Sequence, residues 1–261
     1  MRTPDLTLSY GPLPEHVVDV RLPAGAGAAP LVVVVHGGFW KAEWDRSHTA
    51  PQSAGLAAAG YVVATVEYRR VAMPGGGWPG TFDDLALLTD TVPGLVAEAF
   101  PGRVAPGRTV LVGHSAGGHL AAWVASRHRL PAGSPWRRAT QPTVGVVSLA
   151  GVLDLRLADR LGLGGHATRA LLGGTADEVP QRYAVADPAG LLPTGVPTVL
   201  VHGSRDEAVP LEVSEAYRAA AAAAGQDVGL RVLDGLDHMA LVDPASPAWP
   251  TVLAAIAEAL A

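Results

Sequence analysis

The sequence contains no cysteine, and this absence excludes several kinds of chemistry at once. A disulfide, a thiolate nucleophile and a cysteine-bound metal are all ruled out. Long hydrophobic runs are missing too: the strongest apolar stretches, such as residues 31–35, are far shorter than the ~20 residues of a membrane-spanning helix. The first 15 residues also lack the apolar core of a signal peptide. We therefore expect a cytoplasmic protein with no membrane partner.

Lysine is also scarce, and acidic residues slightly outnumber basic ones. Lys41 is the only lysine, no basic block occurs, and the formal net charge is −5. Nucleic acid is therefore not expected as a partner. The histidines are scattered without an H-E-x-x-H pattern, and the glycines at 75–77 are not followed by the lysine of a phosphate-binding loop. Neither a metal nor a cofactor is expected.

Hydrophobic residues are abundant, at 49% of the chain, and are enough for the core of one large domain spanning residues 1–261. Apolar β-branched runs alternate with alanine- and leucine-rich stretches, which predicts βαβ units and an α/β fold with a mainly parallel sheet of about eight strands. The strands predicted individually cover residues 16–22, 31–36, 61–67, 109–113, 143–149, 197–202 and 228–233. The predicted helices cover residues 51–59, 81–99, 116–127, 211–224 and 248–260.

The segment 154–195 is the irregular part of the chain. Helical patterns occur at 156–161 and 167–172, so the segment is either a small insertion that caps the site or a crossover helix with long loops. In parallel sheets, ligands bind beyond the carboxyl ends of the strands. Functional residues are therefore expected directly after predicted strands.

Residues 113–117 read G-H-S-A-G, directly behind an apolar run. A strand that turns into a helix through this pattern lifts the serine hydroxyl above the edge of the sheet, where a base can reach it. Gly113 and Gly117 would let the strand and the helix pass close to the turn. The motif predicts Ser115 as a nucleophile; an ordinary glycine-containing turn is the alternative.

A serine hydroxyl needs a base, and His238 is the candidate. It follows the last predicted strand and precedes the last predicted helix. A surface histidine without a role in catalysis is the alternative for this position. His114 and His119 flank the serine motif; His114 is expected to point away from Ser115, and His119 is expected to be structural.

Asp206 is the candidate for the group that orients the base. It follows a buried strand and a glycine turn, and it precedes a helix that begins at a proline. Glu207 and Asp154 are weaker candidates, and a helix N-cap is the alternative role. The chain order of serine, acid and histidine is that of α/β-hydrolases, and it differs from the orders in chymotrypsin-like and subtilisin-like enzymes.

Residues 36–40, H-G-G-F-W, follow the strand predicted at 31–36 and predict an oxyanion hole. Acyl transfer needs backbone N–H groups close to the developing oxyanion, and glycines let the backbone approach. We assign the amides of Gly38 and Phe39, together with the amide of Ala116. A simple glycine turn is the alternative.

Three tryptophans near the predicted site, Trp40, Trp44 and Trp78, are predicted to contact substrate. Aromatic faces suit a flat substrate ring, although these residues could instead seal the edge of the sheet. Arg69 and Arg70 could meet a substrate carboxylate or remain surface charges.

These motifs resemble the α/β-hydrolase superfamily over nearly the whole chain. Within it, H-G-G-F-W together with G-H-S-A-G-G-H-L-A resembles the branch shared by hormone-sensitive-lipase-like esterases and kynurenine formamidases. The esterases usually carry a third glycine where this chain has Phe39, whereas the formamidases usually carry Tyr-Trp where this chain has Phe39-Trp40. The resemblance implies hydrolysis of N-formyl-L-kynurenine to kynurenine and formate through an acyl-enzyme.

Two other functions remain open. One is a carboxylesterase that acts on short-acyl esters, and the other is a non-catalytic binding protein on a hydrolase scaffold. In either enzymatic interpretation the expected partner is a small molecule, aromatic in the formamidase case. A homodimer is compatible with the sequence.

Overall fold

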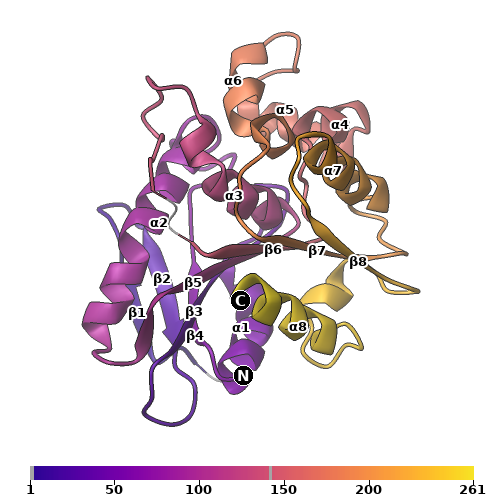
Figure 1. The fold of residues 1–261 in the computed structure, drawn as a ribbon. Coiled ribbons are helices and arrows are strands. Elements are labelled where there is room, and N and C mark those ends of the chain that lie inside the picture. Colours follow the sequence, from indigo (N-terminus) through magenta and orange to yellow (C-terminus); the bar gives the residue numbers. More distant parts are fainter. Residues whose placement is uncertain (1–2, 141–142) are drawn as a thin grey trace.

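In the computed structural model, which describes residues 3–140 and 143–261, eight strands form one sheet in the order β1-β2-β4-β3-β5-β6-β7-β8 (Figure 1). β2 pairs antiparallel with β1 and β4, and all other neighbours are parallel. The strands are β1 (Leu6–Ser9), β2 (Val17–Arg21), β3 (Ala29–Val35), β4 (Val62–Val66), β5 (Val104–His114), β6 (Gly145–Leu149), β7 (Thr198–Gly203) and β8 (Gly229–Leu233). The prediction of a mainly parallel sheet of about eight strands is confirmed.

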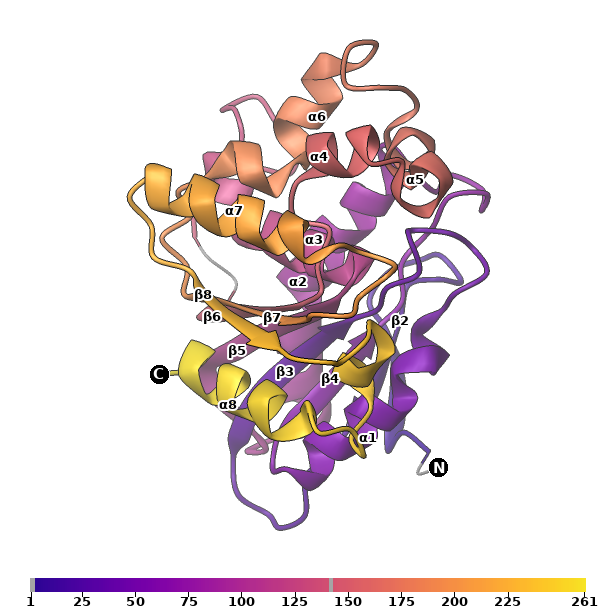
Figure 2. The same cartoon turned by 90° about the vertical axis from the view of Figure 1, so that its right-hand side faces the viewer.

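Helices cover both faces of the sheet (Figure 2). One layer contains α1 (Ala50–Ala58) and α8 (Trp249–Ala259). The opposite layer contains α2 (Gly80–Ala99), α3 (Ala116–Ala125) and α7 (Leu211–Ala223). Short 3-10 turns connect these elements at η1 (Arg46–Thr49), η2 (Arg127–Arg129), η3 (Pro188–Leu191) and η4 (Met239–Val242).

The double covering explains the composition of the central strands. In β3, Val32 and Val34 pack in the cluster that contains Leu56 and Ile256 from α1 and α8. Leu31, Val33 and Val35 pack on the other face, in the cluster that contains residues of α2 and α3. A strand buried on both faces gains from an apolar side chain at every position, so the run is continuous instead of alternating.

The predicted helices and strands are all present, with shifted ends. β5 begins at Val104 instead of residue 109, and α3 ends at Ala125, two residues before the predicted end. β1 was not predicted individually, because it is a four-residue edge strand with the sequence Leu-Thr-Leu-Ser and mostly exposed side chains. Pairing with β2 stabilises this strand, and the local sequence pattern does not predict that pairing.

The segment 154–195 forms α4 (Leu155–Arg160), α5 (Leu163–Leu172) and α6 (Pro180–Ala186) on the outer side of the α2/α3/α7 layer (Figure 1). Both predicted helical stretches are present, and α6 is an addition. The segment is therefore a small group of helices and not a single crossover helix. Its action as a lid and the single-domain organisation stay predictions, as do the cytoplasmic location and the homodimer. Within the described residues, no helix is both long and apolar enough to cross a membrane.

Asp187, between α6 and η3, joins the end of this segment to its first helix, α4. Its carboxylate is buried and accepts a hydrogen bond from the amide of Leu155, at 3.0 Å. Burial raises the pKa of Asp187 to about 7. The folded protein therefore holds a proton that the unfolded chain releases at a pH near 4.

Because the folded state holds this proton, we expect the free energy of unfolding to depend on pH. The contribution of protonated Asp187 to the free energy of unfolding is complete below the pKa that this group has in the unfolded chain. It is lost as the pH rises to about 7. We expect the free energy of unfolding to fall between pH 5 and pH 7 by an amount approaching 1.4 kcal/mol per pH unit. Asp187→Asn removes the titrating group and should flatten this part of the profile, as measured by urea unfolding. Equal slopes for the two proteins would contradict the prediction.

Candidate active site

Ser115 lies at the sharp turn between β5 and α3. Its backbone has φ 55° and ψ −121°, a conformation that a residue with a side chain adopts only when its surroundings impose it. Hydrogen bonds to the neighbouring strand and its loop help to fix it: the amide of Ser115 donates to the carbonyl of Leu149 at 2.8 Å, and the amide of Val152 donates to the carbonyl of Ser115 at 3.2 Å. The predicted strained turn is present.

The two glycines of the motif, Gly113 and Gly117, are required because there is no room for a side chain at either position. A Cβ at Gly117 would lie 2.0 Å from the carbonyl oxygen of Val35, and a Cβ at Gly113 would lie 2.1 Å from the carbonyl oxygen of Gly117. Any side chain at these positions would push α3 away from β3 and β5. The close packing of α3 against the sheet therefore places Ser115 at the carboxyl end of β5.

Asp206 and His238 form a direct pair. His238 Nδ1 lies 2.6 Å from Asp206 Oδ2, and the Asp206 side chain has no exposed surface. A carboxylate only accepts hydrogen bonds, so Nδ1 carries the proton and Nε2 of the neutral ring is left as a base. The other carboxylate oxygen accepts from the amides of Ala208 and Val209 at 2.9 and 2.8 Å.

Sequence reasoning missed a second histidine beside this carboxylate. His202, at the end of β7, is fully buried, and its Nε2 lies 3.3 Å from Asp206 Oδ2 and 2.8 Å from the carbonyl oxygen of Val209. Burial alone would raise the pKa of Asp206, but the hydrogen bonds from His202 and His238 outweigh it and hold this pKa well below its usual value. Asp206 therefore stays ionised throughout the neutral range.

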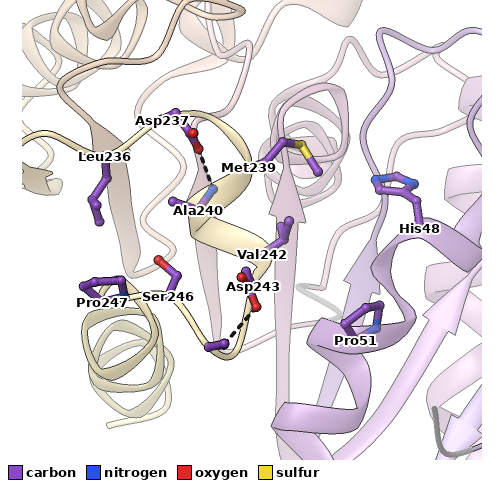
Figure 3. A pocket seen from close by; sticks show the side chains of 11 residues that line it. His48, Pro51, Leu236, Asp237, Met239, Ala240, Val242, Asp243, Ser246 and Pro247 are labelled. Atoms are coloured by element: carbon purple, nitrogen blue, oxygen red, sulfur yellow. Dashed lines mark hydrogen bonds between the residues drawn. The ribbon is translucent and has the colours of Figure 1, made fainter.

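Ser115 and His238 line the same cavity, which has a volume of about 330 Å³. The other lining residues are Gly38, Phe39, Trp44, His48, His114, Ala208 and Met239. The Ser115 hydroxyl makes no hydrogen bond to the His238 ring, both of which lie within the described part of the chain; such contacts are often long in the absence of substrate. His48 and Met239 also line a neighbouring hollow of about 590 Å³ (Figure 3).

The loop after β3 brings backbone donors to this cavity. Gly38 and Phe39 have φ values of 102° and 49°, so the chain turns through the left-handed region directly beside Ser115. The amides of Gly38, Phe39 and Ala116 donate no hydrogen bond to another residue within the described ranges. Ala116 is the first residue of α3, whose N-terminal end favours negative charge. The three amides assigned from the sequence are thus available as donors.

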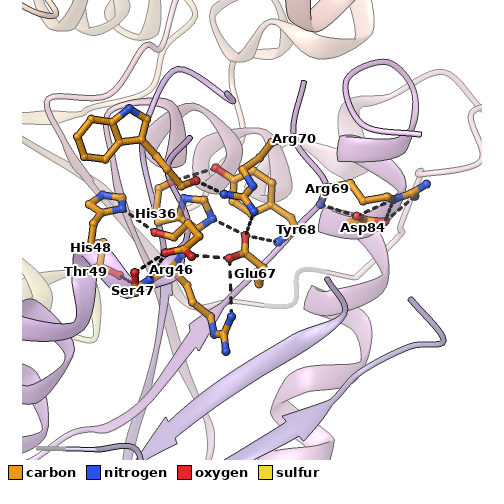
Figure 4. A network of polar contacts seen from close by, with 12 residues as sticks. His36, Arg46, Ser47, His48, Thr49, Glu67, Tyr68, Arg69, Arg70 and Asp84 are labelled. Atoms are coloured by element: carbon orange, nitrogen blue, oxygen red, sulfur yellow. Dashed lines mark hydrogen bonds and ion pairs between the residues drawn. The ribbon is translucent and has the colours of Figure 1, made fainter. Parts of the chain in front are cut away.

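A buried carboxylate, Glu67, supports this loop from the end of β4 (Figure 4). Glu67 Oε1 lies 2.8 Å from His36 Nε2, and Oε2 accepts from the backbone amide of Arg46 at 3.0 Å. Tyr68 stacks on the His36 ring at 4.4 Å and donates its hydroxyl to the His36 carbonyl. Burial would raise the pKa of Glu67, but the hydrogen bond and charge of His36 lower it below its usual value.

Arg70 extends this network, and Arg69 belongs to another. The Arg70 guanidinium lies 3.5 Å from Glu67 and donates to the carbonyl of Trp44. Arg69 binds the buried Asp84, with Nη2 at 2.6 Å from Oδ1. Both expectations for these arginines were wrong, because their guanidinium groups are neither available for a substrate carboxylate nor free surface charges.

The three tryptophans separate in space. Trp44 is half exposed and lines the cavity. Trp40 is fully buried, edge-on to His119, and Trp78 packs against Phe82 and Trp136. Neither Trp40 nor Trp78 lines the cavity, which corrects the prediction that they contact substrate. Both residues pack against other aromatic side chains, and the alternative that they seal the edge of the sheet stays a prediction.

The two histidines that flank the serine motif have different surroundings, and His119 has the structural role expected of it. The rings of His114 and His238 lie 4.4 Å apart, and His114 Nε2 lies 3.1 Å from the carbonyl oxygen of His238. His114 thus lines the cavity beside His238, and burial holds its pKa well below the usual value, so the ring is neutral; its expected direction away from Ser115 stays a prediction. His119 is fully buried, with Nε2 2.9 Å from the carbonyl oxygen of Ala186.

Metal chemistry has no candidate ligands here. Among the residues that the structure describes, no group of three or more histidine, cysteine, aspartate or glutamate side chains could hold a metal ion.

Comparisons with known proteins give a family match and several esterase relatives. The BD-FAE family model matches residues 18–220. Isoprenylcysteine alpha-carbonyl methylesterase ICME of Arabidopsis thaliana is 28% identical over 91% of this chain and 57% of its own length. Esterase LipC of Mycobacterium tuberculosis is 27% identical over 88% of this chain and 58% of its own length. The chain thus spans little more than half the length of these curated relatives.

Solved structures share the fold. A truncated carbohydrate esterase from gut microbiota aligns with a TM-score of 0.81 and 18% identity, covering 99% of both chains. Esterase Est2 of Thermogutta terrifontis aligns with a TM-score of 0.73 and 22% identity, covering 95% of this chain and 89% of its own. At these identities the likeness shows the α/β-hydrolase fold that the motifs indicated.

Glu67→Gln should destabilise the protein, because it removes the charge that compensates Arg46 and Arg70 in a buried setting. Breaking such a buried pair costs about 3 kcal/mol or more in the free energy of unfolding. Glu98→Gln, at an exposed position of α2, is the matched control and should change it by less than about 0.5 kcal/mol. Urea unfolding at pH 7 measures both, and similar values for the two variants would count against a structural role for Glu67.

Proposed function

Since this chain belongs to the BD-FAE family, we propose that it is a serine carboxylesterase that cleaves small acyl esters through an acyl-enzyme. One observation carries the proposal: the ring of His238, held by the buried carboxylate of Asp206, lines the same cavity as Ser115. The esterase names of the relatives support an ester over an amide as the substrate.

In the proposed first step, Ser115 attacks the ester. His238 Nε2 takes the hydroxyl proton as Ser115 Oγ bonds to the carbonyl carbon, and Asp206 stabilises the imidazolium that forms. The tetrahedral intermediate then collapses. The bond to the alcohol oxygen breaks, and His238 returns the proton to that oxygen, which leaves the acyl group on Ser115.

The amides of Gly38, Phe39 and Ala116 are proposed to hold the oxyanion in this step. Backbone donors that are already fixed in place cost no reorganisation when charge develops. In the second step, a water molecule gives its proton to His238 Nε2 and attacks the acyl carbon. The acid is released and Ser115 regains its proton from His238.

The size of the cavity supports a short acyl group. Its volume of about 330 Å³ is at the low end for small-molecule sites, and Phe39, Trp44 and Met239 give it an apolar lining. A butyryl chain would fit beside these side chains.

Two observations favour this function over hydrolysis of N-formyl-L-kynurenine. The relatives named above are esterases, and no formamidase is among them. The cavity and the neighbouring hollow contain no arginine or lysine among their lining residues, so a carboxylate of N-formyl-L-kynurenine placed in these two spaces would have no cationic partner. N-formyl-L-kynurenine remains the competing substrate.

A comparison of substrates tests this choice. We expect kcat/KM for p-nitrophenyl butyrate to exceed kcat/KM for N-formyl-L-kynurenine by about 100-fold or more, because an unpaired buried charge costs about 3 kcal/mol. Both rates are followed by absorbance under the same conditions. A preference for the formamide would overturn the carboxylesterase proposal in favour of the formamidase.

Ser115→Ala tests the nucleophile. We expect kcat on p-nitrophenyl butyrate to fall by at least about 10³-fold while the melting temperature is retained, since the hydroxyl is needed for catalysis. A fluorophosphonate probe should add to the unchanged protein and not to the variant, as seen by intact mass. Ser9→Ala, at an exposed position of β1, is the control. If the wild-type protein neither hydrolyses p-nitrophenyl butyrate nor reacts with the probe, the alternative of a non-catalytic binding protein is supported.

A further inference from the structure

The hollow of about 590 Å³ adjoins the cavity that contains Ser115 (Figure 3). His48 and Pro51, from η1 and α1, form one side of it, and residues around η4 form the other. His48 and Met239 line both spaces, so a ligand can extend from one into the other.

The direction of the proposed reaction decides which part of the ester enters this hollow. The alcohol oxygen must lie next to His238 Nε2, because that nitrogen protonates it as the bond breaks. Leu236, Asp237 and Met239, which flank His238 in the chain, all line the hollow. The binding mode proposed below places the alcohol portion in this hollow and the acyl portion in the smaller cavity beside Phe39.

His48 presents a hydrogen-bond acceptor at the boundary between the two spaces. Its Nδ1 lies 2.7 Å from the carbonyl oxygen of Asp45, and a carbonyl oxygen only accepts, so Nδ1 carries the proton. Burial lowers the pKa of His48, which keeps the ring neutral at pH 7. Its Nε2 therefore has a free lone pair, and this atom bonds to no other side chain or carbonyl within the described residues.

We infer that the hollow binds the alcohol portion of the ester and that His48 Nε2 accepts a hydrogen bond from a hydroxyl group on that portion. The inference rests on the proposed esterase function and makes His48 a specificity-determining residue. Asp237 and Asp243 also line the hollow, and no arginine or lysine does, so the alcohol is hydroxylated and carries no negative charge.

Another hollow, of about 500 Å³, also adjoins the cavity and shares Ala208, His238 and Met239 with it. Its charged residues Arg205 and Glu207 are exposed, so water competes for any contact that they make. His48 does not line it, and substitutions at His48 therefore separate the two paths.

Two esters of equal size test the inference. 2-Hydroxyethyl butyrate and propyl butyrate differ only in a terminal hydroxyl in place of a methyl group. We expect His48→Phe to lower the ratio of their kcat/KM values by about 3- to 10-fold, the usual effect of one hydrogen bond. The intrinsic difference between the two alcohols cancels, because it is the same for both proteins. His48→Gln, which keeps an acceptor, should retain part of the ratio.

Pro51→Ala is the matched control, because it changes the wall of the same hollow without removing a hydrogen-bonding group, and it should leave the ratio unchanged. If both esters are hydrolysed and neither His48 variant changes the ratio, the inference is overturned and the esterase proposal stands. If the unchanged protein hydrolyses neither of these esters nor p-nitrophenyl butyrate, the proposed function fails and the inference fails with it. Should His48→Phe not fold, His48→Ala, which also removes the acceptor, takes its place, and an unchanged ratio in that variant overturns the inference.

Discussion

The interaction on which the site depends is the hydrogen bond between the buried carboxylate of Asp206 and the ring of His238. An ionised carboxylate without exposed surface would be unstable alone, because burial disfavours its charge. His202, His238 and two backbone amides together supply the hydrogen bonds that keep it ionised. The same carboxylate then fixes the tautomer of His238, so one buried charge determines both the position and the basicity of the ring.

A second buried carboxylate serves the other half of the site in a similar way. Glu67, at the end of β4, holds His36 and the loop that carries the backbone donors, and through Arg70 it holds the segment of Trp44. Asp206 follows β7. The carboxyl ends of parallel strands thus place two charged anchors, on either side of Ser115, and each one immobilises a different loop against the sheet.

The elements and residues that could be predicted are those with a local signature at a strand end. The turn at Ser115 has a short motif, Asp206 follows the buried apolar strand β7, and His238 follows its neighbour β8, so their ends converge in a parallel sheet. The orientations of side chains in the loops could not be predicted. Trp40 and Trp44 are four residues apart, yet a left-handed turn sends the first into the core and leaves the second at the cavity. The position of His48, in the η1 turn, was missed for the same reason.

The packing of α5 on the loop after β3 links two distant parts of the chain. A Cβ at Gly164 would lie 2.6 Å from the ring of Phe39, so glycine at 164 is what leaves room for an aromatic side chain at 39. Side chains at the two positions would occupy the same space, so a larger residue at 164 requires a smaller one at 39. We expect them to covary across descendants of this sequence, so that the helical segment and the oxyanion loop evolve as a coupled unit.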